Sequence, residues 1–596
     1  MWLLVSRHCS WAGLGGQLKM AFRCPVSNLL KKTESRIARI GNGIFTEIAR
    51  QNPIEFPSVQ ENIKTITENK GMNKEQSSIL LVSLLLLSAC AILYELLIST
   101  VSTYLLGSSV LHFSITIGLF LTFLGIGSWL SKFLNEPLLE RFILIELLLG
   151  LVGGFSALIL YIGNAYFDSY YGLLLLTTAS VGTLAGMEIP ILTRLLEKTD
   201  SLRSLIAHVL TFDYLGALVA SLAFPLLLLP IFGTMRTAFV VGLINWSVAV
   251  FNLIIFKNYL KSAISLKILS VFIGIVLIIG FLTSFQLMSF ADDLAYQDNI
   301  ILSEQTPYQR LVLTEWNDDI RLYLNGNLQF SSVDEYRYHE ALIFVPLVVA
   351  MKPEMNVLVL GGGDGLALRD IWKTDSFFQK KGIGSINSVD LVDLDEQMVQ
   401  LAKTNHLFTD LNKKAFDNPK VKCYFEDAFG FVKKNSKRYD VILIDLPDPS
   451  DPALGKLYSK EFYTMLRQSI AANGVIVTQS TSPFFAREPF WCINHTLQSV
   501  FPQVTPYHAQ VPSFGDWGFN MAFAQKSNNS DVNFIQKRLA KTLEDPSVFC
   551  RFLNKNNVLS CFQFDKDTED VISVPVSTLE NMNLVTLYDK SFKKFH

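Results

Sequence analysis

Long apolar stretches fill the first half of the chain. Seven of them follow one another between about residues 77 and 290, and each approaches the ~20 residues with which a helix crosses a bilayer. A helix in the core of a soluble protein keeps a polar face, whereas these stretches are apolar all round. The pattern predicts a multi-pass bundle of about seven transmembrane helices, at residues 77–99, 108–130, 142–163, 171–193, 208–231, 236–256 and 266–288.

A different pattern begins near residue 291, where short strand-like apolar runs alternate with helical stretches. Runs at 310–314 and 321–324 predict a small hairpin region ahead of the main fold. Alternation of strands and helices predicts βαβ units and a mostly parallel, doubly wound α/β sheet, Rossmann-like and of the methyltransferase type. Its predicted strands are 357–360, 388–392, 421–425, 441–444, 475–478, 504–510 and 521–524.

These patterns divide the chain into four regions. They are a polar N-terminal extension (1–76), the transmembrane helical domain (77–290), the α/β domain (291–526) and a C-terminal extension (527–596) that we expect to pack on the α/β domain. The first region is basic at its start, which leaves a targeting segment and a loosely ordered tail as alternatives. Met72 stands just before the first apolar stretch, so the sequence leaves open whether residues 1–71 belong to the mature protein.

Positive charges are unevenly distributed among the loops between the predicted spans. They gather after the second, fourth and sixth spans, at Lys132, Arg141, Arg194, Lys198, Arg203, Lys257, Lys261 and Lys267. Because cytoplasmic loops carry the excess of Lys and Arg, this distribution places the N-terminus inside. With seven spans the α/β domain would then lie outside.

The composition argues against two classes of site. The formal net charge of −2 provides no bulk attraction to nucleic acid, so we expect no nucleic-acid partner. The seven cysteines are scattered without a C-x-x-C pair, and no His/Cys cluster accompanies them. Neither a zinc site nor a disulfide framework is predicted.

The first strand of the main fold ends in a glycine-rich turn, which runs from Gly361 through Gly363 and Asp364 to Gly365. Glycines allow a sharp turn and a close approach of the backbone to a ligand, although such a turn also joins a strand to a helix where no ligand binds. The turn therefore marks a candidate binding edge of the sheet.

Acidic residues follow the next two strands. Asp393 ends the second strand, after a polar stretch at 373–385, and is placed to accept the hydroxyls of a ribose. Asp427 and Ala428 follow the third strand and suit the amino group of an adenine. Carboxyl ends of parallel strands meet at one crevice. Since this pattern contains no Lys or Arg clamp for phosphates, it favours an adenosyl sulfonium over NAD or ATP.

Two further acidic positions stand at the end of the fourth strand. Asp445 and Asp448 are three residues apart where the chain leaves the sheet, and an ordinary Asp-Pro turn is the alternative interpretation. Upstream, Tyr338 and His339 belong to an acidic and aromatic segment, residues 334–340. That segment also fits the start of a solvated helix.

The chain resembles the spermidine synthases, a family of polyamine aminopropyltransferases. The resemblance covers roughly residues 303–526 and rests on Pro307-Tyr308-Gln309, Leu324-Asn325-Gly326, the segment 334–340, the Gly-Gly-Gly-Asp-Gly turn, Asp393, Glu426-Asp427 and Asp445-x-x-Asp448-Pro449. Three more segments, 186–190, 212–217 and 511–519, resemble the membrane-fused bacterial branch of that family.

The resemblance implies a reaction and a set of residues for it. The aminopropyl group of decarboxylated S-adenosylmethionine, the co-substrate, moves to a polyamine such as putrescine, giving spermidine and methylthioadenosine. Asp445 is then the base for the attacking amine. The polyamine contacts Tyr338, His339 and Asp448, and the co-substrate contacts Gln309, Gly361, Gly363, Asp364, Asp393, Asp427 and Ala428. In this arrangement Asp364 meets the amine of the aminopropyl arm with Gln309 nearby, and no metal is required.

The resemblance also implies a lipid bilayer as partner, a location in the bacterial inner membrane and a homodimer as the candidate assembly. The loop charges conflict with it on one point, because they place the α/β domain outside although the aminopropyl donor is a cytosolic metabolite. Leu366, Asp393 and Phe514 depart from the family pattern and leave the acceptor amine open.

Two other functions stay open at this stage. An S-adenosylmethionine-dependent methyltransferase shares the sheet and the glycine turn, although the acids near the cofactor tail would repel the carboxylate of intact S-adenosylmethionine. A non-catalytic polyamine sensor or transporter is motivated by Glu95, Glu188 and Asp213 inside the predicted spans, because buried membrane charges often mark function. The alternative interpretation is that these three residues only form hydrogen bonds between helices.

Overall fold

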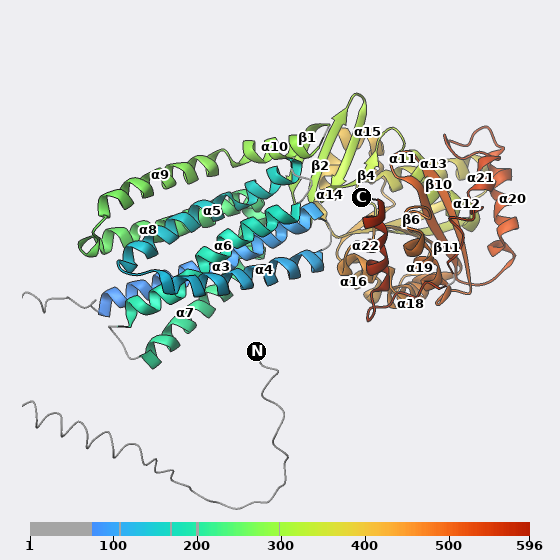
Figure 1. Ribbon diagram of the computed structural model, residues 1–596. Coiled ribbons are helices and arrows are strands. Elements are labelled where there is room, and N and C mark those ends of the chain that lie inside the picture. The colour runs from blue at the N-terminus through green and yellow to red at the C-terminus, as the bar shows by residue number, and fades with distance from the viewer. Residues whose placement is uncertain are drawn as a thin grey trace, which may run out of the picture. The chain divides into compact units, whose positions relative to one another are not determined.

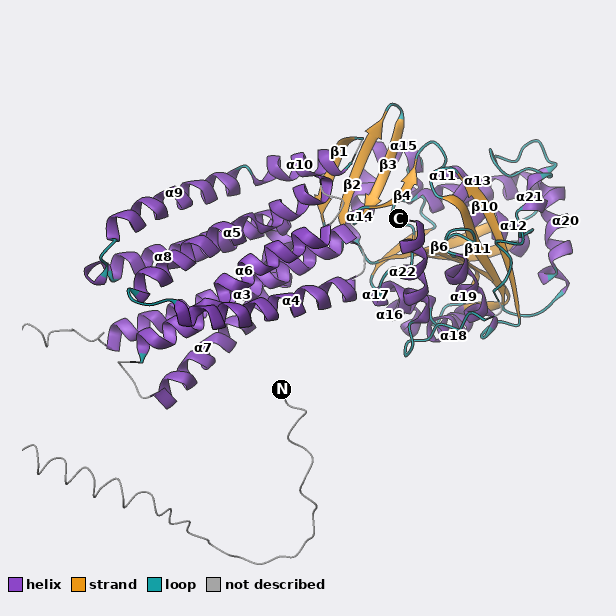
Figure 2. Ribbon diagram, in the orientation of Figure 1, coloured by secondary structure: helices purple, strands orange, loops and turns teal. Residues whose placement is uncertain are grey.

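The computed structural model describes residues 74–106, 109–166, 170–197, 202–296, 298–571 and 573–595 (Figure 1). The predicted N-terminal extension up to residue 73, the question of residues 1–71 and the loop charge Lys198 lie outside the described residues. In the described part, helices occupy the chain up to residue 295, and strands begin after it (Figure 2).

Helices form the first region because its apolar stretches contain few residues that break a helix. The helices are α3 Lys74–Leu106, α4 Ser109–Leu130, α5 Leu138–Tyr166, α6 Tyr170–Leu196, α7 Leu202–Ala223, α8 Leu229–Ile255, α9 Ala263–Leu282 and α10 Ser284–Ala295. Among the described residues, six helices are long and apolar enough to cross a membrane. One of the six, Arg203–Ile255, contains both the fifth and the sixth predicted span and leaves helical geometry at Gly233. Six such helices therefore account for the seven predicted spans.

Small residues bring the helices of this bundle close together. A Cβ atom on Gly150 of α5 would lie 2.9 Å from the carbonyl oxygen of Gly242 on α8, and a Cβ on Gly242 would lie 2.7 Å from the carbonyl oxygen of Gly150. The backbones of α5 and α8 thus touch where both residues lack a side chain, as is common between apolar helices. α5 also packs against α3, α6 and α9.

A small antiparallel sheet precedes the main domain. It has the order β1-β2-β3-β4, from β1 Asn299–Gln305, β2 Arg310–Trp316, β3 Asp319–Leu324 and β4 Asn327–Ser331. The predicted hairpin corresponds to β2 and β3. Two flanking strands extend it.

The main sheet contains seven strands in the order β10-β11-β9-β8-β5-β6-β7. They are β5 Glu354–Gly361, β6 Ser385–Asp393, β7 Val421–Phe425, β8 Tyr439–Asp445, β9 Ile470–Gln479, β10 Gln503–Val511 and β11 Gly515–Phe523. The five strands from β9 to β7 run parallel, and β11 is antiparallel to both of its neighbours. The prediction of a mostly parallel Rossmann-like sheet is confirmed.

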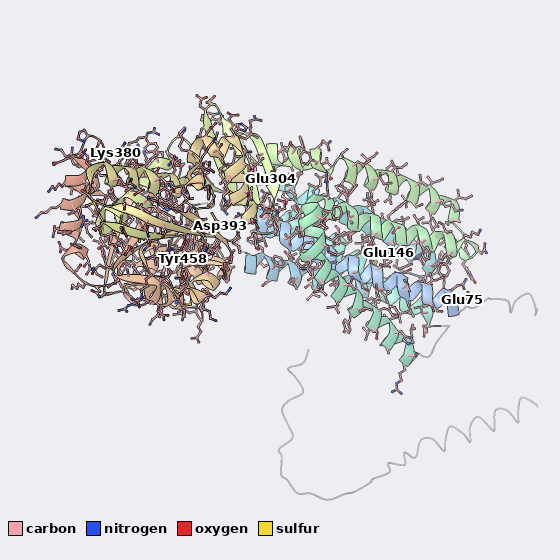
Figure 3. All side chains as sticks on the ribbon, turned by 180° about the vertical axis from the view of Figure 1, so that it is seen from behind. Glu75, Glu146, Glu304, Lys380, Asp393 and Tyr458 are labelled. Atoms are coloured by element: carbon pink, nitrogen blue, oxygen red, sulfur yellow. The ribbon has the colours of Figure 1, made fainter. Side chains whose placement is uncertain are left out.

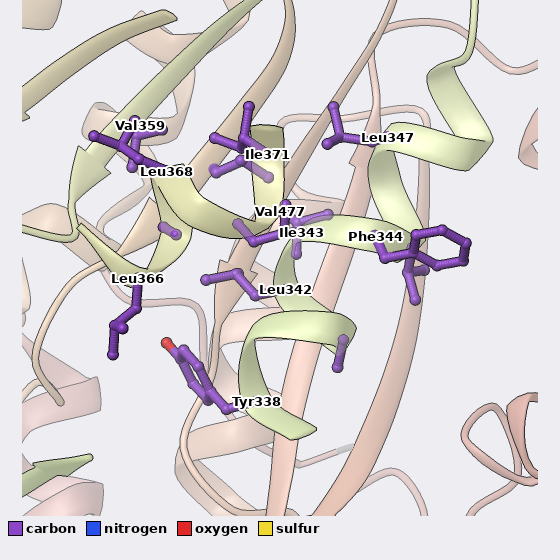
Figure 4. Close-up of a cluster of buried hydrophobic side chains, with 14 of the residues drawn as sticks. Tyr338, Leu342, Ile343, Phe344, Leu347, Val359, Leu366, Leu368, Ile371 and Val477 are labelled. Atoms are coloured by element: carbon purple, nitrogen blue, oxygen red, sulfur yellow. The ribbon is translucent and has the colours of Figure 1, made fainter. Parts of the chain in front are cut away.

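Helices and short turns connect and cover the strands. They include α11 Glu335–His339, the π-helical segment η4 Glu340–Phe344, α12 Val345–Ala350, α13 Leu366–Lys381, α14 Glu396–Thr404, α15 His406–Asn412, α16 Ala428–Lys434, α17 Pro452–Gly455, η6 Lys456–Tyr458, α18 Lys460–Ser469 and α19 Arg487–Gln498. Figure 4 shows a part of the core in which Leu342 and Ile343 lie beside Val477 of the sheet and Leu368 lies beside Val359. Buried side chains thus fix the segment that carries Tyr338 against the strands.

The end of the chain returns to the domain. It contains α20 Val532–Leu543, α21 Asn557–Ser560 and α22 Asn583–Phe595. The buried carboxylate of Glu340 accepts backbone N–H bonds from three successive residues, Arg551, Phe552 and Leu553, at 2.6 to 3.0 Å. Helix α22 packs against α19 and α17. These contacts bring the last residues of the chain back to the sheet.

Candidate active site

Four adjacent strands place the predicted site residues at one edge of the sheet. Gly361 at the end of β5 is the register partner of Asp445 at the end of β8. Asp393 at the end of β6 pairs with Phe425, and Asp427 follows that strand end by two residues. Because these strands are parallel, their carboxyl ends meet at the same edge. The structure therefore brings together the residues that the sequence pattern associates with strand ends (Asp393 is labelled in Figure 3).

The glycine turn fits between two carboxylates. Gly361 has φ +87°, and a Cβ there would lie 1.9 Å from the carbonyl oxygen of Asp445, so no other residue fits. A Cβ on Gly362 would lie 3.2 Å from Oδ2 of Asp445, and one on Gly363 would lie 2.6 Å from Oδ2 of Asp393. The turn thus runs between the side chains of Asp445 and Asp393, and its glycines leave the space beside both.

Two carboxylates next to the turn each accept a backbone hydrogen bond through Oδ1. Oδ1 of Asp364 accepts the backbone N–H of Leu366 at 2.8 Å, and Oδ1 of Asp393 accepts the N–H of Asp395 at 2.9 Å. Burial raises the pKa of Asp364 to about 6, opposed by the positive charge of His339. Burial likewise raises the pKa of Asp393 to about 6, although backbone N–H bonds oppose the shift. Both groups are poised to bind a cation at neutral pH.

Asp445 is held by a tyrosine from α11. The hydroxyl of Tyr338 donates to Oδ1 of Asp445 at 2.6 Å, which leaves Oδ2 beside the glycine turn. Burial raises the pKa of Asp445, while His339 and the bond from Tyr338 act in the opposite direction. A carboxylate with a raised pKa and a fixed orientation is suited to accept a proton from a bound ligand.

Asp448 is held from two distant parts of the chain. Tyr588 of α22 donates its hydroxyl to Oδ2 at 2.9 Å, and the side-chain amide of Gln479 at the end of β9 donates to Oδ1 at 3.2 Å. Burial raises the pKa of Asp448 to about 6, and these two bonds oppose the shift. Sequence reasoning identified neither Gln479 nor Tyr588, because each lies far from Asp448 along the chain.

A buried ionic network lies behind these acids. Nδ1 of His339 contacts Oε2 of Glu335 at 2.8 Å, and the guanidinium of Arg369 contacts the same carboxylate at 2.8 Å. Burial disfavours the charged imidazole, but the bond and charge of Glu335 prevail and raise the pKa of His339 to about 9. Burial would raise the pKa of Glu335, yet His339 and Arg369 lower it to about 2. His339 therefore carries a positive charge that acts on Asp445 and Asp364, and its contact with a substrate stays a prediction.

Two predicted ligand residues take up positions that the sequence pattern did not indicate. The side-chain amide of Gln309 donates to Oδ2 of Asp395 at 2.9 Å, so Gln309 is tied to the end of β6. Asp427 accepts the N–H of Gly430 and thereby caps α16, of which Ala428 is the first residue. Lys456 of η6 contacts Oδ1 of Asp427 at 3.0 Å. The sequence near this strand end contains no positively charged residue that was expected to contact Asp427, but the fold brings Lys456 to it from a later segment.

The arrangement favours a cationic ligand pair. Asp364, Asp393, Asp445 and Asp448 are partly exposed at the edge of the sheet, and the positive charge of His339 acts on two of them, Asp364 and Asp445. Within the described residues no group of three or more His, Cys, Asp or Glu side chains is arranged to hold a metal ion. A site rich in carboxylates raises the local concentration of cations and stabilises them when bound.

Comparisons with known proteins point to one family. Residues 335–534 match the Spermine/spermidine synthase domain. A polyamine aminopropyltransferase of Leptospira interrogans serogroup Icterohaemorrhagiae serovar copenhageni (strain Fiocruz L1-130) is 41% identical over 515 residues, which cover 86% of this chain and 99% of that protein. Polyamine aminopropyltransferase 2 of Ralstonia nicotianae (strain ATCC BAA-1114 / GMI1000) is 40% identical over 523 residues, 87% of this chain and 98% of that protein.

A similarity to solved structures accompanies these matches. Spermidine synthase from Thermotoga maritima superposes with a TM-score of 0.39 and 24% sequence identity, over 45% of this chain and 85% of that chain. The 515 residues matched in the Leptospira protein outnumber those between residue 291 and the C-terminus, so that match extends into the helical region.

Proposed function

This chain belongs to the polyamine aminopropyltransferase family, and we propose that the acidic edge of its sheet binds decarboxylated S-adenosylmethionine together with a polyamine such as putrescine. The protein is a transferase of polyamine biosynthesis. The aminopropyl group moves to an amine of the acceptor, and the products are spermidine and methylthioadenosine.

The observation that carries this proposal is the position of Asp445 and Asp448 beside the glycine turn. Both substrates are cations, because the donor has a sulfonium and an ammonium and the acceptor has two ammonium groups. Asp445 is fixed by Tyr338, and Asp448 by Tyr588 and Gln479, so the two carboxylates are oriented before any ligand arrives. Oriented groups lower the cost of holding two reactants in line.

The geometry supports a single displacement step. Asp445 accepts a proton from the attacking ammonium, and the freed nitrogen lone pair forms a bond to the aminopropyl carbon next to sulfur. The carbon–sulfur bond breaks, and its electron pair stays on sulfur, which becomes a neutral thioether. Asp448 holds the second ammonium of the acceptor, and Asp364 holds the ammonium of the aminopropyl arm. Asp393 and Asp427 hold the ribose and the adenine.

A product assay tests the proposed reaction. The full chain is purified in detergent and incubated with decarboxylated S-adenosylmethionine and putrescine, and methylthioadenosine and spermidine are quantified. A methyltransferase would instead release S-adenosylhomocysteine from intact S-adenosylmethionine. A sensor or transporter would bind polyamine without releasing either nucleoside. Either of those results would overturn the proposal.

The raised pKa values of the site acids predict a loss of activity on the acidic side. Asp364, Asp393 and Asp448 have a pKa of about 6, whereas the substrates stay cationic throughout the acidic range. Above this pH the carboxylates are ionised and attract the substrates, and below it they are protonated and neutral. We therefore expect kcat/KM to fall as pH drops through about 6. The measurement is a pH profile of kcat/KM, with the melting temperature followed in parallel; a flat profile well below this pH in folded protein would contradict the assigned roles.

Tyr588 should act as a positioning residue for the acceptor. Replacing Tyr588 by phenylalanine removes the bond to Asp448, which holds and stabilises the ionised carboxylate. We expect KM for putrescine to rise about fivefold, corresponding to the ~1 kcal/mol net worth of a hydrogen bond, with KM for the donor unchanged. The acid limb of the putrescine profile should also move to higher pH, because the pKa of Asp448 rises when a donor is lost.

The control for this experiment is the exposed Tyr166 of α5, where the same substitution removes a hydroxyl far from the acids along the chain. Both kinetic constants and both acid limbs should stay unchanged in Tyr166→Phe. An equal rise of both KM values in Tyr588→Phe, with no shift of the acid limb, would indicate a general packing role for α22.

A lipid bilayer around the bundle is the second part of the proposal. Many apolar side chains of α7 and α9 point to the outside of the bundle, among them Leu218, Leu222, Ile268 and Leu282, each of which is more than half exposed. A soluble protein rarely leaves such a continuous apolar face in water. The proposal is tested by membrane fractionation of the expressed chain and by a reporter fused at His596, which reads the side on which the domain lies. Release of the chain by salt or alkaline washing without detergent would contradict it.

A further inference from the structure

Two glutamates inside the bundle lie against one another. Glu146 of α5 and Glu188 of α6 are 0% and 2% exposed, and their carboxyl groups are within hydrogen-bonding reach of each other (Glu146 is labelled in Figure 3). Oε1 of Glu146 and Oε1 of Glu188 receive no hydrogen bond from any described residue. Two ionised carboxylates in such contact would repel, and neither could donate a bond to the other.

The surroundings of this carboxyl pair supply almost no donors. The amide nitrogen of Asn245 on α8 donates to Oε2 of Glu146 at 3.1 Å, while Oδ1 of this fully buried asparagine receives no bond from the part of the chain that the structure describes. Among the described residues no lysine, arginine or histidine forms an ion pair with either glutamate, although many other acids of the chain have such a partner. An unpaired carboxylate in an apolar interior is very costly, so the site requires a cation.

The groups that face the pair come from three further helices. Cys90 and Tyr94 of α3 are close enough to feel the charges of both glutamates, Asp213 of α7 acts on Glu188, and α8 contributes Asn245. None of these groups is positively charged. Tyr94 is fully buried, and its hydroxyl has no hydrogen-bond partner in the described ranges either. The cation must therefore come from outside the protein.

The packing determines which cation fits. The carboxyl groups are already in hydrogen-bonding contact, and the nearby Gly150 and Gly242 bring α5 and α8 into backbone contact. A metal ion or an ammonium between the two carboxyl groups would have to push them apart. A proton is the one cation that fits between two carboxyl groups that are already in hydrogen-bonding contact.

We propose that Glu146 and Glu188 share one proton and form a proton-binding site inside the helical bundle. Asp213 is partly exposed and acts on Glu188, whereas Glu188 and Glu146 are buried. This gradation of exposure gives the proton a route from the surface of the bundle through Asp213 to Glu188 and then to the pair. Intramembrane carboxyl groups in such a series are typical of proton relays. The inference goes beyond aminopropyl transfer and does not depend on it.

Infrared difference spectroscopy on the full chain in lipid nanodiscs tests the site. The wild-type protein should show the C=O stretch of a protonated carboxyl group at neutral pH, shifted by exchange into deuterium oxide. In Glu146→Gln and Glu188→Gln the remaining carboxyl group is buried and should stay protonated, so each single variant should shift the band without reducing it, and the double variant should abolish it. The exposed Glu75 at the start of α3 provides the control, and Glu75→Gln should keep the band.

Three outcomes would overturn the proposal. Absence of the band from wild-type protein would exclude a protonated pair regardless of how the variants fold. Persistence of the full band in the double variant, which has neither carboxyl group, would assign it to other groups. A loss of only half of the band in each single variant would mean that two separate protons are bound. Methylthioadenosine release is measured in the same samples, so that a failure of the transferase and a failure of the proton site can be distinguished.

The route is tested with Asp213→Asn. This variant should keep the band but slow its exchange with deuterium several-fold, because the partly exposed group that acts on Glu188 no longer carries protons. An unchanged exchange rate would overturn the route through Asp213. Exchange in Glu75→Gln serves again as the reference.

Discussion

Replacing Asp445 by asparagine should lower turnover by roughly 10²–10⁴-fold, the usual worth of a positioned base. The attacking nitrogen begins as an ammonium ion and cannot form a bond until it loses a proton. Oδ1 of asparagine can still accept the hydroxyl of Tyr338, whose bond to Asp445 is 2.6 Å long. The substitution therefore keeps the shape and the main hydrogen bond of the site and removes the group that accepts the proton.

Donor binding should change little in Asp445→Asn, because Asp364, Asp393 and Asp427 remain. Stability should not suffer either. Burial raises the pKa of Asp445, which means that the fold disfavours its charged form, so a neutral side chain should leave the melting temperature unchanged or raise it. The measurements are methylthioadenosine release with putrescine and with longer amines, donor affinity by calorimetry, and the melting temperature in detergent.

A matched control lies on the same strand. Asp440 stands at the other end of β8, where it accepts the backbone N–H of Asn356 and contacts Lys352. Asp440→Asn makes the same chemical change in the same strand and should leave turnover nearly intact while lowering stability slightly. A well-folded Asp445→Asn variant with near-normal turnover would show that Asp445 is a turn residue. The methyltransferase and sensor functions would then have to be considered again.

The strands of the main sheet could be predicted from the sequence because they follow a simple pattern. In a parallel sheet covered on both faces, strands are short apolar runs bounded by turns, and each of the seven predicted runs lies on a strand of the structure, except that the last extends one residue beyond β11. The strand-end acids were predictable for the same reason, since parallel topology brings their positions together whatever the details of packing. The positions of Asp393 and Asp445 at this edge of the sheet could therefore be predicted from the sequence alone.

The helix after the glycine turn was harder to predict. We predicted no element for the polar stretch 373–385, yet α13 continues to Lys381 through most of it. Phe377 and Phe378 are buried on one side of this helix, while Lys380 and Lys381 face solvent. An amphipathic turn of this kind appears polar when the residues are counted without regard to the face on which they lie.

The remaining site residues could not be predicted, because they depend on contacts between segments that are distant along the chain. Tyr588 reaches Asp448 across 140 residues, and Lys456 reaches Asp427 from a turn after another strand. No local pattern encodes such pairs, because they depend on how the final helices pack against the sheet. The same holds for Glu146, which one apolar stretch contains without any signal that Glu188 and Asn245 will face it. Sequence reasoning selected Glu188 and Asp213 and missed the partner that makes them a site.

Replacing Asp364 by asparagine should weaken donor binding more than it slows chemistry. A charge-assisted bond to the ammonium of the aminopropyl arm contributes about 1.5–3 kcal/mol, and its loss should lower donor affinity roughly 10- to 150-fold. Putrescine affinity and turnover at saturating donor should change far less, because Asp445 and Asp448 are intact. The measurement is calorimetric titration of wild type and variant with decarboxylated S-adenosylmethionine.

The local structure makes Asp364→Asn a clean substitution. Oδ1 of Asp364 accepts the backbone N–H of Leu366 at 2.8 Å, and an asparagine Oδ1 can accept the same bond, so the start of α13 should be preserved. Asp410 of α15 is exposed and offers a control in which the same charge is removed from the surface of the domain.

Because burial raises the pKa of Asp364 to about 6, the wild-type affinity for the donor should also fall as pH drops through this value. The affinity of Asp364→Asn should depend less on pH, since the titrating group is gone. Equal donor affinity in wild type and variant, or an unaltered pH dependence, would remove Asp364 from the donor site and leave it as a turn residue at the start of α13.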